Sequence, residues 1–185
     1  PPVVSSAASD VYKRQHYFQP MIGGDLALLQ GLIKAVLASE ETQKNILDKE
    51  FIENHTSGLL ELREEIGKTD WSFIESESGL SRTKIEEVAS LYCQSKKVIA
   101  CWAMGLTQQK HAVSTIQHIV NLLLFRGNIG RPGAGVCPVR GHSNVQGDRT
   151  VGITEHPNES LLKNLDAQFG ISSPRNSGFN TVQAI

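Results

Sequence analysis

The stretch KVIACWAMGLTQQKHAVSTIQHIVNLLLF, residues 97–125, decides the fold class of this chain. Its first seven residues form a short apolar run that favours a β-strand, and Met104-Gly105 supplies a turn after it. A long helix is expected from about Gln109 to Phe125. A strand, a turn and a helix in this order make half of a βαβ unit, which predicts an α/β fold with a parallel sheet.

The residues before this stretch predict three helical zones. Apolar side chains recur at helical spacing over residues 25–37 and 81–93, which begin with an Asp and a Ser as the expected N-caps. The zone between them, residues 49–66, breaks at residues 56–58 and ends near Gly67. Helices therefore precede the strand along the chain.

A glycine-rich connection, RGNIGRPGAGVCPVRGHSNVQGD, follows as residues 126–148. Pro132 and Pro138 block a helix around its central glycines, so the segment does not fit a dinucleotide fingerprint, and no phosphate-loop Lys-Ser/Thr pair follows. Two interpretations stay open. The glycines either serve turns in a structured connection or let a ligand approach the backbone closely, and irregular segments of this length are uncommon unless they bind something or are disordered.

The last forty residues predict short elements. Residues 151–153 are an expected strand, and residues 158–169 an expected helix with an inward leucine face that Gly170 closes. Residues 172–178 read as a loop, after which Asn180 is placed to cap a further helix.

The composition of the chain limits its class. With 39% apolar residues, 20% charged residues and a net charge of -1, the 185 residues have the balance of a globular protein and lack a nucleic-acid footprint. The longest charge-free apolar run, about residues 112–125, is too short for a membrane span. Cys93, Cys101 and Cys137 are odd in number and lack metal-ligand spacing, so we expect buried or half-buried free thiols and no metal ligands.

Three motifs carry a family resemblance. The segments CWAMGLTQ (101–108), LLLFRGNIGRPGAGVCPVRG (122–141) and HSNVQGD (142–148) resemble the molybdopterin oxidoreductases, specifically the formate-dehydrogenase-like alpha subunits. The resemblance runs from about His16 to the last residue. It implies a Rossmann-like fold, in which helices cover both faces of a parallel sheet in three layers.

The resemblance also implies a cofactor and a division into domains. The cofactor is a molybdenum or tungsten atom held by a bis-molybdopterin guanine dinucleotide between α/β domains. Residues 16–139 are then part of one α/β cofactor-binding domain, and residues 140–185 are the truncated start of a neighbouring one. On this interpretation the chain is an internal fragment that is inactive alone, and the metal-ligating residue and any [4Fe-4S] motif lie upstream of His16.

Seven cofactor-binding positions follow from the aligned motifs. They are Met104, Gly105 and Gln108 in the first loop and Gly141, Asn144, Val145 and Gln146 in the second. An ordinary turn after a strand remains the alternative for the first loop. If both loops hold one cofactor, we expect residues 104–108 to lie close to residues 140–146.

Arg140 and His142 are the candidate catalytic residues. The aligned family arginine lies at the metal, and the planar fork of donors on Arg140 suits a small anionic substrate. His142 stands where well-known formate dehydrogenases carry a glutamine. An imidazole can relay a proton near neutral pH, whereas an amide cannot, so this difference bears on whether formate is the substrate. A structural role for His142 stays open.

Residues 1–15, PPVVSSAASDVYKRQ, differ from the rest. Asp10 to Gln15 back-translates to a sequence that resembles a transposon end used in sequencing libraries, so we interpret residues 1–15 as a non-native leader that packs against nothing. The absence of a signal peptide then says nothing about export, and a cytoplasmic location rests on the resemblance.

Two functions of different classes emerge. The first is a two-electron oxidoreductase acting on a small oxyanion-type substrate, with an electron-transfer subunit as partner, no nucleic acid and no membrane span. The second is a non-catalytic α/β module whose glycine-rich loop holds a nucleotide or a protein partner. Only the first requires molybdenum, so metal content separates them.

Overall fold

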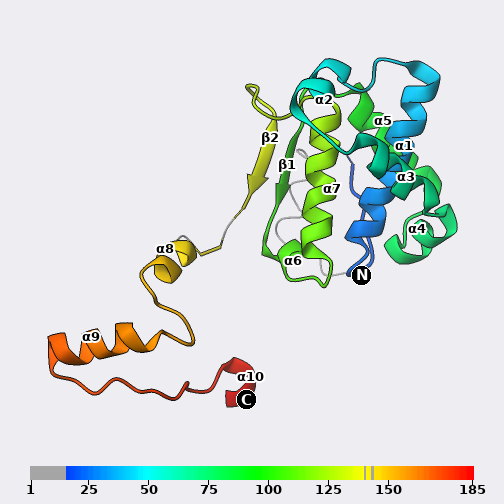
Figure 1. The fold of residues 1–185 in the computed structure, drawn as a ribbon. Coiled ribbons are helices and arrows are strands. Elements are labelled where there is room, and N and C mark those ends of the chain that lie inside the picture. The colour runs from blue at the N-terminus through cyan, green and yellow to red at the C-terminus, as the bar shows by residue number, and fades with distance from the viewer. Residues whose placement is uncertain (1–15, 140, 143) are drawn as a thin grey trace. The chain divides into compact units, whose positions relative to one another are not determined.

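A computed structural model describes residues 16–139, 141–142 and 144–185 of the chain. The chain divides into two compact units, with the boundary after Val139, and each is described by itself (Figure 1). The expected leader, residues 1–15, lies outside the described residues, as does Arg140. The assignment of each unit to an α/β domain stays a prediction.

The first unit is rich in helices and carries a small sheet. Its elements, in chain order, are α1 (Asp25–Gln43), α2 (Lys49–His55), α3 (Leu59–Lys68), α4 (Trp71–Ser78), α5 (Arg82–Gln94), β1 (Ile99–Trp102), α6 (Met104–Thr107), α7 (Ala112–Phe125) and β2 (Gly135–Pro138).

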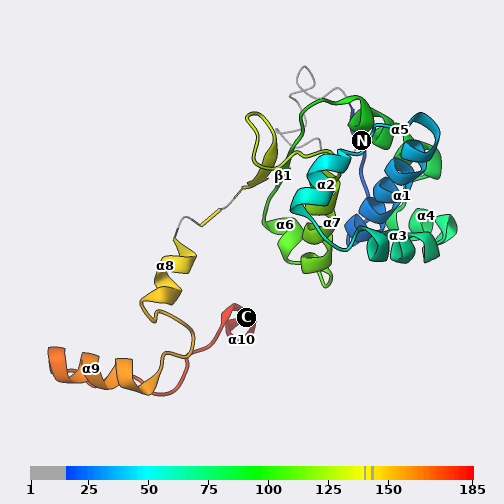
Figure 2. The same ribbon diagram turned by 45° about the horizontal axis from the view of Figure 1, so that its top comes forward.

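Helix α1 is the central element of this unit. It contacts α3, α4, α5 and α7, and its Ile33 and Val36 are fully buried. In the main core, these two residues cluster with Ile66 of α3, Ala89 of α5 and Phe125 of α7. Figure 2 shows α1 among the other helices, with the strands to one side. A helix surrounded in this way must be apolar over most of its circumference.

The strands β1 and β2 pair in parallel and are joined through α7, so the predicted strand and helix are confirmed as the first part of a βαβ unit. The second strand of this unit was not predicted, because β2 lies within the glycine-rich connection. Ile99 lies opposite Gly135, and Trp102 opposite Pro138. At the two ends of the ladder, Gly135 N donates to Val98 O and Val139 N donates to Trp102 O, at 3.0 and 2.7 Å. The described residues contribute these two strands alone, so the expected three-layer sheet is not confirmed.

The helical predictions are largely confirmed, with corrections at the caps. The break at residues 56–58 is present, and Gly58 there adopts the left-handed conformation, with φ 83°. Asp25 is not the N-cap of α1, because the cap residue is Gly24 and Asp25 lies in the first helical turn. Ser81 occupies the N-cap of α5, but its side chain accepts no capping hydrogen bond. Helix α4 was not predicted, because it is short and lacks an extended apolar pattern.

A buried carboxylate shapes the turn between α1 and α2. Glu40, 7% exposed, accepts hydrogen bonds from Ile46 N at 2.7 Å and Leu47 N at 3.0 Å, and it pairs with Lys49 Nζ at 2.9 Å. Burial acts to raise the pKa of Glu40, but these hydrogen bonds and the Lys49 charge outweigh it, so the pKa lies below its ordinary value of 4.5. The carboxylate is therefore ionised in the fold and holds the turn in place.

The second unit contains α8 (Val145–Thr150), α9 (Glu159–Phe169) and α10 (Thr181–Ala184). The helix predicted over residues 158–169 is confirmed, and Gly170 ends it in the left-handed conformation. The strand predicted over residues 151–153 is wrong: Gly152, with φ 88°, turns the chain there, and Ile153 N returns to Asp148 O at 2.9 Å.

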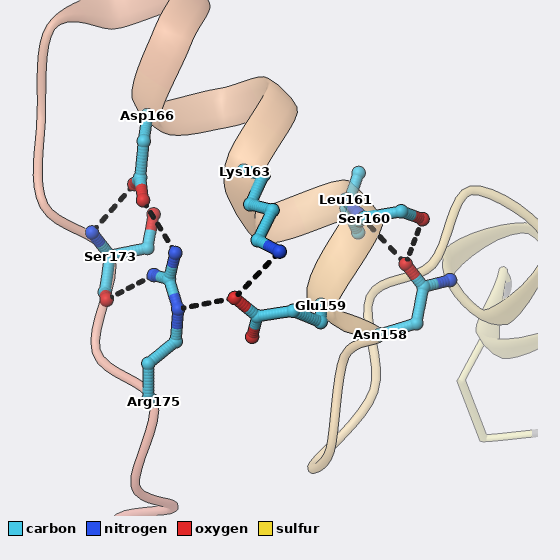
Figure 3. A network of polar contacts seen from close by, with 8 residues as sticks. All are labelled: Asn158, Glu159, Ser160, Leu161, Lys163, Asp166, Ser173 and Arg175. Carbon is cyan, nitrogen blue, oxygen red and sulfur yellow. Dashed lines mark hydrogen bonds and ion pairs between the residues drawn. The ribbon is translucent and has the colours of Figure 1, made fainter.

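Polar contacts organise α9 and the segment after it (Figure 3). Asn158 caps the helix by accepting from Leu161 N at 2.8 Å. Asp166 accepts from Ser173 N and from Arg175 Nη2, each at 2.7 Å, and these contacts lower the pKa of Asp166 to about 2. The expected inward face of α9 buries no residue, and Phe169 is 67% exposed. Local hydrogen bonds rather than a core hold this segment.

We expect Gly31→Ala to lower the free energy of unfolding by about 1–3 kcal/mol, because it overpacks the contact between α1 and its neighbours. An added Cβ would lie 2.8 Å from Ile74 Cγ2 and 3.1 Å from Ile85 Cγ2, and both side chains are fully buried. Urea unfolding followed by tryptophan fluorescence measures this, since Trp71 and Trp102 both belong to the first unit.

The matched control is Gly67→Ala on α3, where an added Cβ meets nothing within 4 Å. There Ala should stabilise the protein by up to about 1 kcal/mol through helix propensity. Equal stabilisation by both substitutions would contradict the close packing at Gly31.

We expect Glu40→Gln to cost about 1–3 kcal/mol of stability at pH 7, because buried backbone donors lose an ionised acceptor. The pKa of Glu40 is lowered in the fold, so its contribution is present above pH 4.5 and is lost as the pH falls through the folded value. The difference from the unmodified protein should therefore shrink below about pH 4.5. Glu41→Gln, at the exposed neighbouring position, is the control; a cost independent of pH would argue against an ionised Glu40.

Candidate functional site

Three of the predicted site residues lie in one turn directly after β1. Helix α6 begins at Met104, two residues beyond the carboxyl end of the strand (Figure 1). Met104 is 43% exposed, and Gly105 and Gln108 are exposed as well. The first predicted cofactor loop therefore presents its residues together, at the end of the strand where ligands bind in parallel α/β folds.

Gly105 is not required by the fold of the chain. Its backbone is not in the left-handed region, and a Cβ added there would meet nothing within 4 Å. Most glycines are explained by a positive φ or by a close neighbour, and Gly105 has neither. What the glycine does provide is an uncovered backbone that a molecule outside the chain can approach closely.

The connection from α6 to α7 differs from the sequence-based expectation. Helix α7 starts at Ala112 rather than near Gln109, because Gln109 is used to fix the connection. Its Nε2 donates to Asp25 Oδ2 at 2.6 Å, and its carbonyl accepts from Ala112 N at 3.1 Å. No local signal reveals this contact, since Gln109 and Asp25 lie 84 residues apart.

Gln109 thus anchors the turn, while the neighbouring Gln108 is left exposed. Within the described part of the chain, the side chain of Gln108 has no hydrogen-bond partner. A free amide can both donate to and accept from a ligand.

Apolar side chains adjoin the polar groups at this end of the sheet. Val139 is 54% exposed, and its backbone N–H donates to Trp102 O, which places it beside the end of β1. Together with Met104 it makes this end of the first unit partly apolar. An exposed surface of mixed character suits a ligand with both ring and phosphate groups.

The three cysteines differ in burial. Cys93 is half-buried, as expected, but Cys101 and Cys137 are exposed, so that part of the expectation is wrong. They lie opposite each other in the parallel register. Partial desolvation and the contact with Cys137 raise the pKa of the Cys101 thiol, which favours its protonated form. Among the described residues no group of three or more His, Cys, Asp or Glu side chains is arranged to hold a metal ion.

The remaining predicted site residues belong to the second unit. Gly141 and His142 are exposed in a bend, and Asn144, Val145 and Gln146 begin α8, also exposed.

The Asn144 side chain does not cap α8, although Asn144 occupies the N-cap position. It folds over Gly147 instead, where an added Cβ would lie 2.2 Å from Asn144 Oδ1. Gly147 therefore makes room for this amide, a role that the sequence did not indicate.

The predicted site residues thus form two groups, one in each unit. The expected proximity of residues 104–108 to residues 140–146 concerns two separate units and stays a prediction. Arg140 itself lies outside the described residues, so its role stays a prediction. In the part of the chain that the structure describes, the helices are all too short or too polar to cross a membrane.

Comparison with known proteins finds relatives over most of the chain. No family model matches it. The chain is 45% identical over 174 residues to Protein YdeP of Escherichia coli, a match that covers 91% of the chain and 23% of that protein. It is 46% identical over 170 residues to an uncharacterized oxidoreductase of Mycobacterium tuberculosis, covering 91% of the chain and 22% of the relative.

A third relative has a more specific name. The chain is 35% identical over 131 residues to the F420-dependent formate dehydrogenase subunit alpha of Methanocaldococcus jannaschii, covering 71% of the chain and 19% of that subunit. The chain therefore spans less than a quarter of the length of these relatives. It is related to oxidoreductases, and these matches support a family related to the molybdopterin oxidoreductases.

One solved structure resembles the fold. Acetylene hydratase from Pelobacter acetylenicus matches with a TM-score of 0.56 and 24% sequence identity, over 62% of this chain and 15% of that one. At this identity the likeness concerns the fold.

Proposed function

We propose that the chain is part of a molybdopterin oxidoreductase and that residues 104–108 form one of the loops that hold its pterin cofactor. The observation that carries the proposal is the turn after β1. Gly105 leaves the backbone open there, although the fold of the chain has room for a side chain at this position. Parallel α/β folds bind their ligands at this end of a strand. The 35% identity to a formate dehydrogenase alpha subunit supports a molybdenum or tungsten pterin as the ligand.

The groups in this turn fit a pterin guanine dinucleotide. The open backbone at Gly105 suits a close approach, and the exposed amide of Gln108 suits a ring edge or a phosphate. In the second unit, Gly141, Asn144 and Gln146 are exposed and bear the same kinds of group. A bound molybdenum or tungsten centre would supply the exchange of two electrons with the substrate.

Arg140 and His142 are proposed to act on the substrate. Arg140 would orient a small anion such as a carboxylate through two parallel hydrogen bonds. His142, which is exposed, would accept or return a proton near neutral pH.

Further parts of the proposal concern the complete protein. We place its metal ligand and any [4Fe-4S] cluster upstream of His16, with an electron-transfer subunit as partner and the cytoplasm as location. The substrate class is a small oxyanion. Formate is one candidate substrate. Because His142 stands where well-known formate dehydrogenases carry a glutamine, other small oxyanions should be tested as well.

Metal analysis of the complete protein that carries this sequence tests the proposal first. We expect close to one molybdenum or tungsten atom per protein. Protein without either metal, but able to bind a nucleotide or a protein partner, would instead favour the non-catalytic α/β module.

We expect Gly105→Leu to lower the metal content at least about tenfold, because the side chain would occupy space that the cofactor needs, at a cost of about 1.4 kcal/mol or more. Folding should be unaffected, since the position is open within the chain. The control is Gly67→Leu, the same change at an equally open helical glycine. Full metal content in the Gly105 variant, with normal thermal unfolding of both proteins, would remove residues 104–108 from the cofactor site.

We expect Arg140→Lys to leave the metal content near that of the unmodified protein while turnover falls at least about tenfold, or roughly 1.4 kcal/mol of transition-state stabilisation. Lysine keeps the charge but loses the planar two-point contact. Turnover is measured with a redox dye and a set of small oxyanions that includes formate.

Arg149→Lys, at an exposed position paired with Glu155, is the control for Arg140→Lys. Unchanged turnover in the Arg140 variant would exclude a substrate role. Loss of the metal would move Arg140 to the cofactor site and make His142 the next residue to test.

A further inference from the structure

The geometry points to a second ligand site, for a small divalent oxyanion of the phosphate or sulfate class, at the amino ends of β1 and β2. A cavity of about 410 Å³ is lined there by residues 45–48 together with Lys96, Arg126 and Arg131. Residues 45–48 connect α1 to α2, Lys96 precedes β1, and the two arginines precede β2. The cavity is of the size that small-molecule sites have.

The charge of this cavity is positive and is not neutralised by the described residues. Lys96, Arg126 and Arg131 supply three cationic groups, and Asp48 supplies one carboxylate. Asp48 caps α2 by accepting from Phe51 N at 3.0 Å. None of the ion pairs within the described part of the chain includes one of the three cations. A concave surface with an excess of fixed positive charge attracts anions.

The two guanidinium groups are held in place by neutral acceptors. Arg126 donates to Ile46 O at 2.9 Å and to Ser95 O at 3.0 Å. Arg131 donates from Nη2 to Lys96 O at 2.6 Å and to Asn128 Oδ1 at 2.7 Å. Because these acceptors are carbonyl oxygens, they fix the side chains without cancelling their charge. Fixed cations bind an anion without first losing conformational freedom.

Unpartnered donors concentrate at the same place. Arg126 Nε, Arg131 Nε and Asn128 Nδ2 are buried and lack an acceptor within the described residues. Asn128 is fully buried and lies between Val98 N and Arg131, accepting from both through its Oδ1. Buried donors normally find a partner, so this region holds hydrogen-bonding capacity that the described residues do not use.

One wall of the cavity is formed by a constrained turn. Lys44 precedes the cavity lining and Asn45 belongs to it, and their φ values are positive, at 51° and 60°. Residues other than glycine rarely adopt this conformation. The turn persists because Glu40 accepts from Ile46 N and Leu47 N. The cavity is thus framed on this side by a backbone that a buried carboxylate holds rigid.

The oxyanion site is separate from the proposed cofactor loop. Residues 104–108 follow the carboxyl end of β1, whereas the cavity lies before the amino ends of both strands. Figure 1 shows α2 and the connection from α7 to β2 at one end of the unit and α6 at the other. The inference therefore goes beyond the proposed function and can fail or succeed without it.

Titration calorimetry of the full chain with inorganic phosphate tests the site, in chloride buffer at constant ionic strength. We expect saturable binding of one phosphate, competition by sulfate and none by additional chloride. Lys96→Gln should weaken the binding at least about threefold, since it removes one of three cations. The side chain of Lys96 is exposed, and among the described residues only its carbonyl takes part in a hydrogen bond, so folding should be unaffected.

The matched control is Lys97→Gln, the same substitution at the next residue, whose side chain lies against Gly133 and not in the cavity. Its phosphate affinity should equal that of the unmodified chain, and thermal unfolding of both variants should confirm that they fold. Absence of saturable binding overturns the inference. An equal loss of affinity in both variants overturns it as well, because it would reflect the total charge instead of this cavity.

Discussion

The first unit depends on the burial of one helix among four others. Helix α1 can be central because its apolar residues are spread around its circumference and because Gly31 lets α4 and α5 approach its backbone. Removing this apolar area from water is the main favourable contribution to the fold. The position of α7 against α1 then fixes the crossover between β1 and β2, and with it the two ends of the sheet at which the proposed sites lie.

The elements of the first unit could largely be predicted from the sequence, because hydrophobic spacing and glycine positions are local signals. The strand before Met104, the helix after it and the break at residues 56–58 all follow from such signals. The contacts that fix the sites could not be predicted. Gln109 meets Asp25 across 84 residues, and Arg126 meets Ile46 across 80, and no spacing within a segment encodes such pairs.

The second unit marks where local reasoning is weakest. Residues 151–153 have the composition of a strand, but a strand needs a neighbour to accept its backbone hydrogen bonds, and Gly152 turns the chain back on α8 instead. The candidate residues of this unit, including His142 and Asn144, were identified by family resemblance. The structure adds that they are exposed and that Gly147 accommodates the Asn144 amide.

The position of Pro138 in β2 has a consequence for the assembly of the sheet. Gly135 N and Val139 N both point to β1. Successive residues of a strand direct their backbone nitrogens to opposite sides, so those of Val136 and Pro138 face the outer edge of β2. At that edge the proline ring costs no ladder hydrogen bond. The outer edge of β2 consequently offers one backbone donor, that of Val136. A further strand paired to this edge would have few backbone N–H groups to accept from, which disfavours edge-to-edge self-association through β2.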